Sequence, residues 1–208
     1  MPRVRWRSAM SWFALSPVVG SSCPSSNLMR SRRCQMGSSR RSRHGEKVCA
    51  VKSIPVDEVV RLAEYFVGLD WPLSREQGYA ACEALGWPGT SDRGLFVTPY
   101  GLKHLDKASV IVARGGDDVT QVKFWLTDVV RDFSAERDDF MNDFFSLCVQ
   151  EFRGLWGKGK VKLSKEDQEA QWGTLNGCHI ILRNGWKAVN FRLYSPYYTA
   201  VLRSLGDL

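Results

Sequence analysis

The chain has 208 residues and a formal net charge of +7, and this charge is unevenly distributed. Nine arginines and no acidic residue lie within residues 1–45, which alone carry +9, so subtraction from +7 leaves −2 for the rest. The basic character therefore belongs to one end, which weakens an interpretation of the whole chain as a nucleic-acid binder. A hydrophobic fraction of 44% with 8 Trp is enough for a core and excludes a wholly disordered chain.

Residues 1–50 are rich in Ser and Arg and show little apolar periodicity, which predicts a disordered leader. Two alternatives are a start codon assigned too far upstream, with Met29 or Met36 as the true start, and a nucleic-acid-binding arm. Clustered arginines suffice for salt-dependent, non-specific binding. Pro17 and several serines interrupt the apolar stretch that a signal peptide would need.

The six cysteines show no CxxC spacing, so we expect reduced, buried thiols in a cytoplasmic protein. No run approaches the roughly 20 apolar residues that span a bilayer. We therefore expect no contact with a membrane.

Residues 53–208 are expected to form one domain that opens with two helices. Apolar residues recur at helical spacing after Pro55 until Gly68 ends the pattern. The sequence Ser74-Arg75-Glu76-Gln77 has the form of a capping box and opens a second helix through Leu85.

Three strands are predicted next, at Gly94–Pro99, Lys107–Arg114 and Val119–Thr127. A polar turn at Gly115–Asp118 joins the last two into a hairpin.

A long helix is expected from Ser134 to about Trp156, with a wide apolar stripe. The polar segment Lys158–Gln171 is predicted to be a mobile loop. Two β-rich runs follow, Cys178–Arg183 and Trp186–Tyr194. The Asn184-Gly185 pair between them is the preferred pair for a type I′ turn.

A short helix at Tyr197–Leu205 completes the expected order: helix, helix, three strands, helix, two strands, helix. Because strands and helices do not alternate, this order predicts an α+β domain. We expect an antiparallel sheet of about five strands, packed by the N-terminal helix pair and the long helix.

The sequence contains no pattern that indicates catalysis, a metal or a cofactor. It has no Gly-rich phosphate loop, no GxSxG and no HExxH. His104 and His179 stand without a local partner for acid–base chemistry. We therefore expect no enzymatic activity and no cofactor.

Acidic residues supply the candidate site for a protein partner. Four of them recur at spacings of 4, 3 and 4 along or just before the long helix, and so share one face: Asp132, Glu136, Asp139 and Asp143. Asp117 and Asp118 in the polar turn are further candidates. The plain interpretation is a solvated face with a favourable helix dipole, and the sharper one is a contact for a basic partner.

Several short motifs resemble a family of small bacterial domains of unknown function. In that family a first helix ends in an LDWPW-like corner and a second ends in LGW. The corresponding segments are Leu69-Asp70-Trp71-Pro72, Leu85-Gly86-Trp87, Thr127-Asp128 and Leu193-Tyr194-Ser195-Pro196-Tyr197-Tyr198. Leu73 departs from the family's usual aromatic residue, and the Arg/Ser leader has no counterpart.

Such domains are similar in size and composition to the immunity proteins of bacterial polymorphic-toxin systems. The resemblance implies a non-enzymatic antidote that binds and blocks a toxin, here with the acidic residues facing a basic toxin domain. The alternatives are a chaperone-like or regulatory adaptor of the same fold, a nucleic-acid-associated protein acting through its leader, and an enzyme whose site is assembled from scattered residues.

Overall fold

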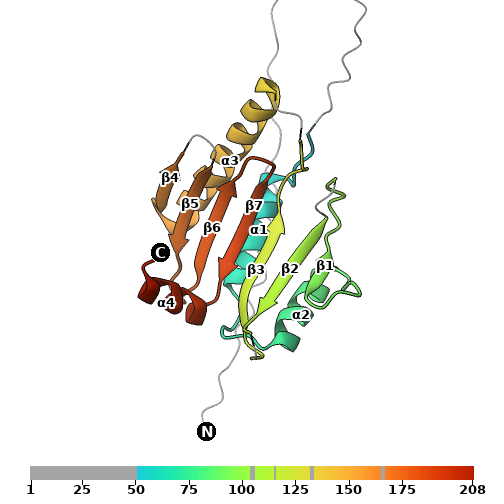
Figure 1. Cartoon of the computed structure of the whole chain (residues 1–208), viewed down its shortest axis with the longest axis vertical. Coiled ribbons are helices and arrows are strands. Elements are labelled where there is room, and N and C mark those ends of the chain that lie inside the picture. The colour runs from blue at the N-terminus through green and yellow to red at the C-terminus, as the bar shows by residue number, and fades with distance from the viewer. Residues whose placement is uncertain (1–50, 104–105, 115, 132–133, 165–166) are drawn as a thin grey trace, which may run out of the picture. The chain divides into compact units, whose positions relative to one another are not determined.

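The computed structural model describes residues 51–103, 106–114, 116–131, 134–164 and 167–208 (Figure 1). All of them belong to the second of two compact units, Lys47–Leu208. The predicted leader and Asp132 lie outside the described residues.

An α+β architecture is confirmed, with helices beside one antiparallel sheet (Figure 1). The sheet has seven strands rather than about five, in the order β1-β2-β3-β7-β6-β5-β4. The elements are α1 (Val56–Val67), α2 (Arg75–Ala84), β1 (Leu95–Val97), β2 (Lys107–Val112), β3 (Val119–Trp125), α3 (Ala135–Trp156), β4 (Lys160–Leu163), β5 (Gln168–Gly173), β6 (His179–Asn184), β7 (Val189–Tyr194) and α4 (Pro196–Leu205).

The prediction of a loop over Lys158–Gln171 is wrong, because this segment holds β4 and most of β5. All four residues of β4 are exposed, so the strand shows no alternation of buried and exposed positions. It pairs with β5, in register from Lys160 opposite Gln171 to Leu163 opposite Gln168. An exposed edge strand with lysines leaves little local signal in the sequence.

The hairpin between β6 and β7 is confirmed, but its predicted type I′ turn is wrong. Asn184 still pairs with Val189, so the connection is a four-residue loop. Gly185 does not have the positive φ that a type I′ turn requires. Tertiary contacts fix this loop instead, since the Arg137 guanidinium donates to the Trp186 carbonyl.

The helix ends match their sequence signals. Ser74 and Gln77 form the reciprocal capping box at the start of α2. The Ser134 hydroxyl accepts from the Arg137 amide and caps α3, and Gly157 follows its last turn. These caps set where the helices begin, and the spacing of their apolar residues sets which faces they turn to the sheet.

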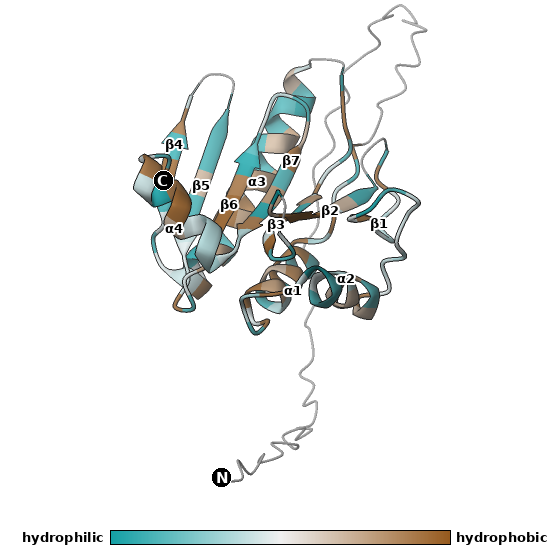
Figure 2. Cartoon of the chain, turned by 60° about the horizontal axis from the view of Figure 1, so that its bottom comes forward, coloured by the Kyte–Doolittle hydropathy of each residue, from teal (hydrophilic) through white to brown (hydrophobic). Residues whose placement is uncertain are grey.

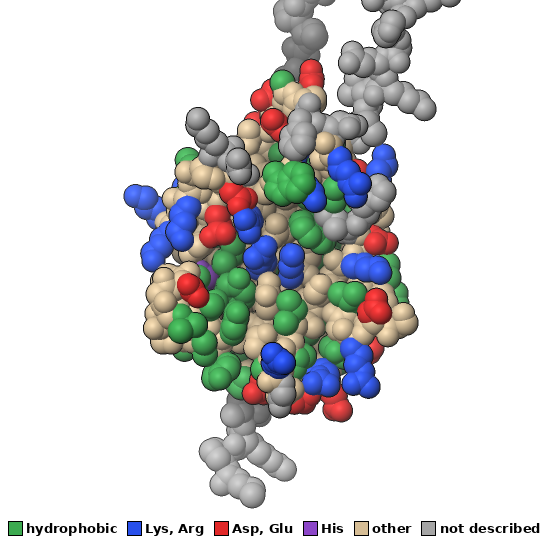
Figure 3. Space-filling model, viewed as in Figure 1, with side chains coloured by type: hydrophobic (Ala, Val, Ile, Leu, Met, Phe, Trp, Pro, Cys, Tyr) green, Lys and Arg blue, Asp and Glu red, His purple; other side chains and the backbone are tan. Residues whose placement is uncertain are grey.

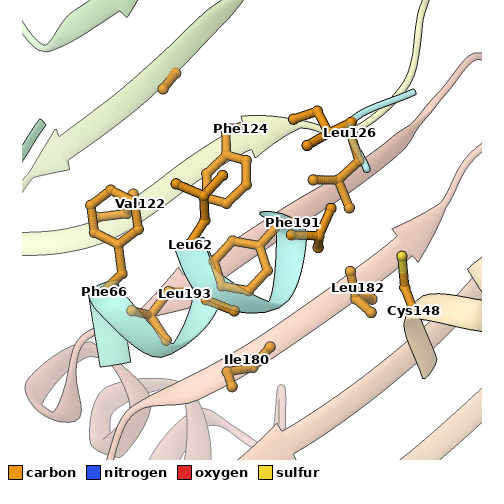
Figure 4. Packing of buried hydrophobic residues seen from close by; sticks show 14 of the residues in the cluster. Leu62, Phe66, Val122, Phe124, Leu126, Cys148, Ile180, Leu182, Phe191 and Leu193 are labelled. Carbon is orange, nitrogen blue, oxygen red and sulfur yellow. The ribbon is translucent and has the colours of Figure 1, made fainter. Parts of the chain in front are cut away.

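One face of the sheet is covered by helices and forms the core. Figure 2 shows α1 and α2 on one side of the strands. Leu62 and Phe66 of α1 lie over Phe124 and Phe191, whose rings stack with centroids 4.7 Å apart (Figure 4). The α3 residue Cys148 lies beside Leu182 of β6. Burial of these side chains is the main driving force for folding.

Candidate functional site

Strand alternation places a second set of side chains on the face opposite the core. Register pairing groups them into rows across β3, β7 and β6. The rows are Gln121–Tyr194–His179, Lys123–Arg192–Ile181 and Trp125–Asn190–Arg183. We call this surface the open face, because helices α1 and α3 lie behind the strands in Figure 1, and Figure 3 shows the side chains on the near side.

Three cations lie at the centre of the open face. Lys123 and Arg192 stand directly opposite each other on β3 and β7, and Arg183 lies nearby on β6. Burial, together with Arg192 and Arg183, lowers the pKa of Lys123. Like charges directly opposite in an antiparallel pair destabilise a sheet, so packing alone does not explain this cluster. Figure 3 shows Lys and Arg side chains gathered there among hydrophobic ones.

The cations are held by neighbouring polar groups. The Arg192 Nε donates to Asn190 Oδ1 at 3.1 Å. Arg183 forms a bidentate ion pair with Asp167, at 3.0 and 2.9 Å from Nε to the two carboxylate oxygens. Arg183 is therefore largely neutralised within the chain, whereas the ion pairs among the described residues do not include Lys123 or Arg192.

Aromatic side chains border the cations, and each ring already contacts another side chain of the protein. The Lys123 ammonium lies 4.6 Å from the centroid of the Trp125 ring. The ring of Tyr194 meets Tyr198 of α4 edge to face, with centroids 5.3 Å apart. Trp186 in the β6–β7 loop carries Lys187 at 3.9 Å. These are cation–π and edge contacts rather than free stacking platforms.

Helix α4 closes one end of the open face, where His179 is buried. Its Nε2 lies 3.4 Å from Gln171 Oε1, and only 7% of the residue is exposed. Burial lowers the pKa of His179 to about 4, and Arg203 and Lys160 add to the shift. A neutral histidine at this end suits packing, and a cavity of about 320 Å³ lies beside it.

A larger polar cavity of about 540 Å³ lies near the start of α3 and the β6–β7 loop. Arg137 and Asn184 contribute buried polar groups to its wall. The Asn142 side-chain oxygen accepts from both Gln168 and Asn184, at 2.9 and 3.0 Å. These bonds join α3 to β5 and β6, so they contribute to folding in the first place.

The acidic residues predicted as a partner site do not form one surface. Glu136, Asp139 and Asp143 are exposed on α3. Asp117 and Asp118 lie in the β2–β3 turn, which Figure 1 shows at the opposite end of the sheet from the start of α3. Hydrogen bonds from its own backbone amide and from Ser134 lower the pKa of Glu136.

In the turn, Asp117 has a structural partner. Its carboxylate lies 3.3 Å from Arg75 Nε, and its carbonyl accepts from the Arg75 amide. Asp118 forms a β-bridge with Ser74. These contacts dock the turn on the start of α2.

The sequence did not predict the cation pair of Lys123 and Arg192, because their opposition depends on the register of β3 and β7 rather than on local sequence.

Within the part of the chain that the structure describes, no group of three or more His, Cys, Asp or Glu could hold a metal ion. Burial raises the pKa of Cys82, Cys148 and Cys178 to about 12, so their thiols are protonated at neutral pH. No described helix combines the length and apolar character that a bilayer crossing requires.

The short motifs of the sequence support the fold rather than the open face. The Trp71 indole donates to the Phe66 carbonyl at 2.9 Å, and Trp87 is buried against Phe66 and Phe124. The buried Asp128 carboxylate accepts from two backbone amides, of Lys52 at 3.1 Å and of Lys103 at 2.7 Å.

The profile of a family of unknown function, DUF6301, matches residues 57–195, which is more than half of the chain. The chain belongs to this family. The DUF6301 match spans α1 to the end of β7 and so includes both faces of the sheet. No curated protein and no solved structure matches the chain.

Proposed function

We propose that this DUF6301 protein is a non-enzymatic, cytoplasmic protein-binding domain of the immunity type, which binds a toxin and blocks it. The observation that supports this proposal is the open face. Helices α1 and α3 stabilise the fold from the other side, so side chains on the open face are available for recognition without loss of the core.

A paired sheet is a rigid support for a binding surface. The central residues of the open face come from β3, β6 and β7, which hydrogen-bond to one another along their length. Their positions are therefore fixed before a partner arrives, which reduces the entropy lost on binding. Partly exposed Trp and Arg side chains are the residue types that dominate the energetics of protein interfaces.

The test begins with the genes on either side of this one: a neighbouring gene that encodes a chain toxic to cells is co-expressed with this protein. We expect the two chains to co-purify as a stoichiometric complex, and growth to be rescued only when the antidote matches the toxin in amount. An unrelated toxin serves as the control. Rescue at far below stoichiometric amounts would contradict the proposal and indicate an enzyme.

A stable complex in which the toxin stays active would also contradict it and favour the chaperone-like or regulatory adaptor. If the two chains form no complex, the proposal is wrong, because an antidote of this type acts by binding the toxin. Each result separates blocking by binding from the other function classes.

A further inference from the structure

We infer that the central open face, formed by Lys123, Arg192, Trp125 and Tyr194, is the docking surface for a carboxylate-rich segment of a partner protein. This inference rests on the proposed protein-binding function and adds the chemistry of the partner. It also moves the expected contact away from the acidic residues of α3.

The first argument is electrostatic. Lys123 and Arg192 are directly opposed in the middle of the sheet, and both are half-buried. An arrangement that weakens the isolated sheet becomes favourable when anionic groups lie between the two cations. Arg183 beside them is already paired with Asp167, so the anionic groups of a partner are expected to meet Lys123 and Arg192.

The second argument distinguishes an acidic protein from a nucleic acid. Single-stranded nucleic acids bind to sheets by stacking bases on free aromatic faces. Lys123 covers the Trp125 ring, Lys187 covers Trp186, and Tyr198 meets the ring of Tyr194. A lysine therefore occupies one face of the Trp125 ring and one face of the Trp186 ring, which leaves fewer ring faces for base stacking. The Arg192 guanidinium still has donors that suit a carboxylate.

The third argument is shape and polarity around the cations. The partly exposed groups around the cations are the Gln121 amide and the Trp125 and Tyr194 rings. Ile181 and Asn190 lie in the same rows but are buried. This mixture fits a peptide with alternating acidic and apolar side chains better than a uniformly charged polymer.

The experiment uses the full chain, isotope-labelled, and follows amide and indole NMR signals during titration. The probes are a 12-residue oligo-glutamate peptide and a single-stranded dT 12-mer. Because the nine arginines of residues 1–45 also attract anions, affinity is read residue by residue from β3 and β7. The variant is Lys123→Gln with Arg192→Gln, and the matched control, with the same change in net charge, is Arg61→Gln with Arg153→Gln on α1 and α3.

We expect peptide-induced shifts centred on β3 and β7, and an affinity at these signals that falls at least about tenfold in the Lys123/Arg192 variant at low salt. The control variant should bind the peptide like the parent. Arg192→Lys, made alone in the parent, keeps the positive charge and should retain most of the parent's affinity for the peptide. A thermal melt of the variant at or above the parent value would show that the loss of binding is not unfolding.

The inference is overturned if peptide shifts are absent from the open face, or if the Lys123/Arg192 variant binds like the control. It is also overturned if the oligonucleotide binds the open face at least tenfold more tightly than the peptide, which would assign the surface to nucleic acid. A toxin complex whose footprint falls on α3 would refute this surface while leaving the antidote function intact. If the peptide binds to the open face but the protein blocks no toxin, the docking surface stands and the antidote function is refuted.

Discussion

Adjacent residues on strand β3 face two different environments. Phe124 is fully buried and stacks on Phe191 of β7, whereas Lys123 and Trp125 on either side of it lie on the open face. The same strand pairing therefore places an aromatic pair on one side of the sheet and the cation pair of Lys123 and Arg192 on the other. The difference teaches that the covered face supplies stability, while the open face keeps an arrangement that stability does not favour.

The strongest way to test this comparison is to truncate neighbours on opposite faces of β3. Phe124→Ala should destabilise the protein by about 3–5 kcal/mol, because it leaves a cavity under α1. Trp125→Ala should cost less than Phe124→Ala, because its ring is only partly buried where it packs against the core and it also loses a cation–π contact. Urea denaturation measures both, and equal losses would show that the open face contributes to the core.

The histidine at the closed end of the open face predicts a dependence of stability on pH. The pKa of His179 is about 4 in the fold, below the ordinary value of 6.5. The unfolded chain therefore binds more protons between these values, so stability is fully present above pH 6.5 and is lost as the pH falls toward 4. The slope from this single group reaches at most about 1.4 kcal/mol per pH unit.

His179→Gln should reduce the fall in the free energy of unfolding between pH 6.5 and 4. At pH 8 the same substitution should change the free energy of unfolding by less. The charged groups that act on His179 are Arg203 of α4, Lys160 and Lys162 of β4, and Glu169 of β5. Denaturation midpoints of parent and variant from pH 4.5 to 8 measure the difference. Parallel curves would mean that His179 titrates as it does in the unfolded chain.

The cation pair itself predicts a small change of the opposite sign. Lys123→Met removes a charge whose pKa is lowered by burial and by Arg192 and Arg183, while it keeps an apolar stem over Trp125. We expect stability to rise by less than about 1 kcal/mol, because water screens much of the repulsion at a half-exposed site. The gain should shrink at high salt, and a clear loss of stability would show that the cation pair supports the fold.

Local signals in the sequence were sufficient for much of the fold. Ser74 and Ser134 mark helix starts through caps that depend on neighbouring residues only. Strand β4 was missed because its four exposed residues lack a buried partner face. The type I′ turn predicted at Asn184-Gly185 is wrong. The side-chain amide of Asn184 donates to the side-chain oxygen of Asn142 on α3, a contact that no local pattern reveals.

The candidate site was harder to predict for a similar reason. The alternation of Val122 and Phe124 with Lys123 shows in the sequence that one face of β3 is polar. The opposition of Lys123 and Arg192 depends on β7 pairing with β3, although the two strands are separated by α3 and three other strands. Acidic residues at helical spacing are visible along the chain, and so they were the residues that the sequence favoured.

Removal of residues 1–45 should have little effect on the domain. The described core begins at Ile54, which is fully buried, and its members all follow that residue. A protein that starts at Glu46 should melt within about 2–4 °C of the full chain, which corresponds to about 1 kcal/mol. A larger loss would show that the basic segment stabilises the fold.

The smallest effect is expected on the acidic residues of α3. Glu136, Asp139 and Asp143 changed together to Lys should leave the rate of association with the toxin of the co-expression test within about threefold at physiological salt. These positions lie on α3, away from the open face, and salt screens charges over that distance. The fold should survive, because Met141, Phe144 and Phe145 hold the helix from its buried side. Lys at position 136 removes a favourable charge near the helix start, so a small loss of stability is expected.

This substitution decides between the two surfaces because they demand opposite partners. A toxin that docks on Lys123 and Arg192 presents carboxylates, and added lysines on α3 do not repel it. A basic toxin that docks on α3 would associate far more slowly with the triple variant at low salt, and the difference would fade as salt screens the charges. Stopped-flow association at two salt concentrations, with Lys123→Gln/Arg192→Gln alongside, therefore shows which face the partner approaches. Slowing in the α3 variant alone would return the contact to the acidic residues.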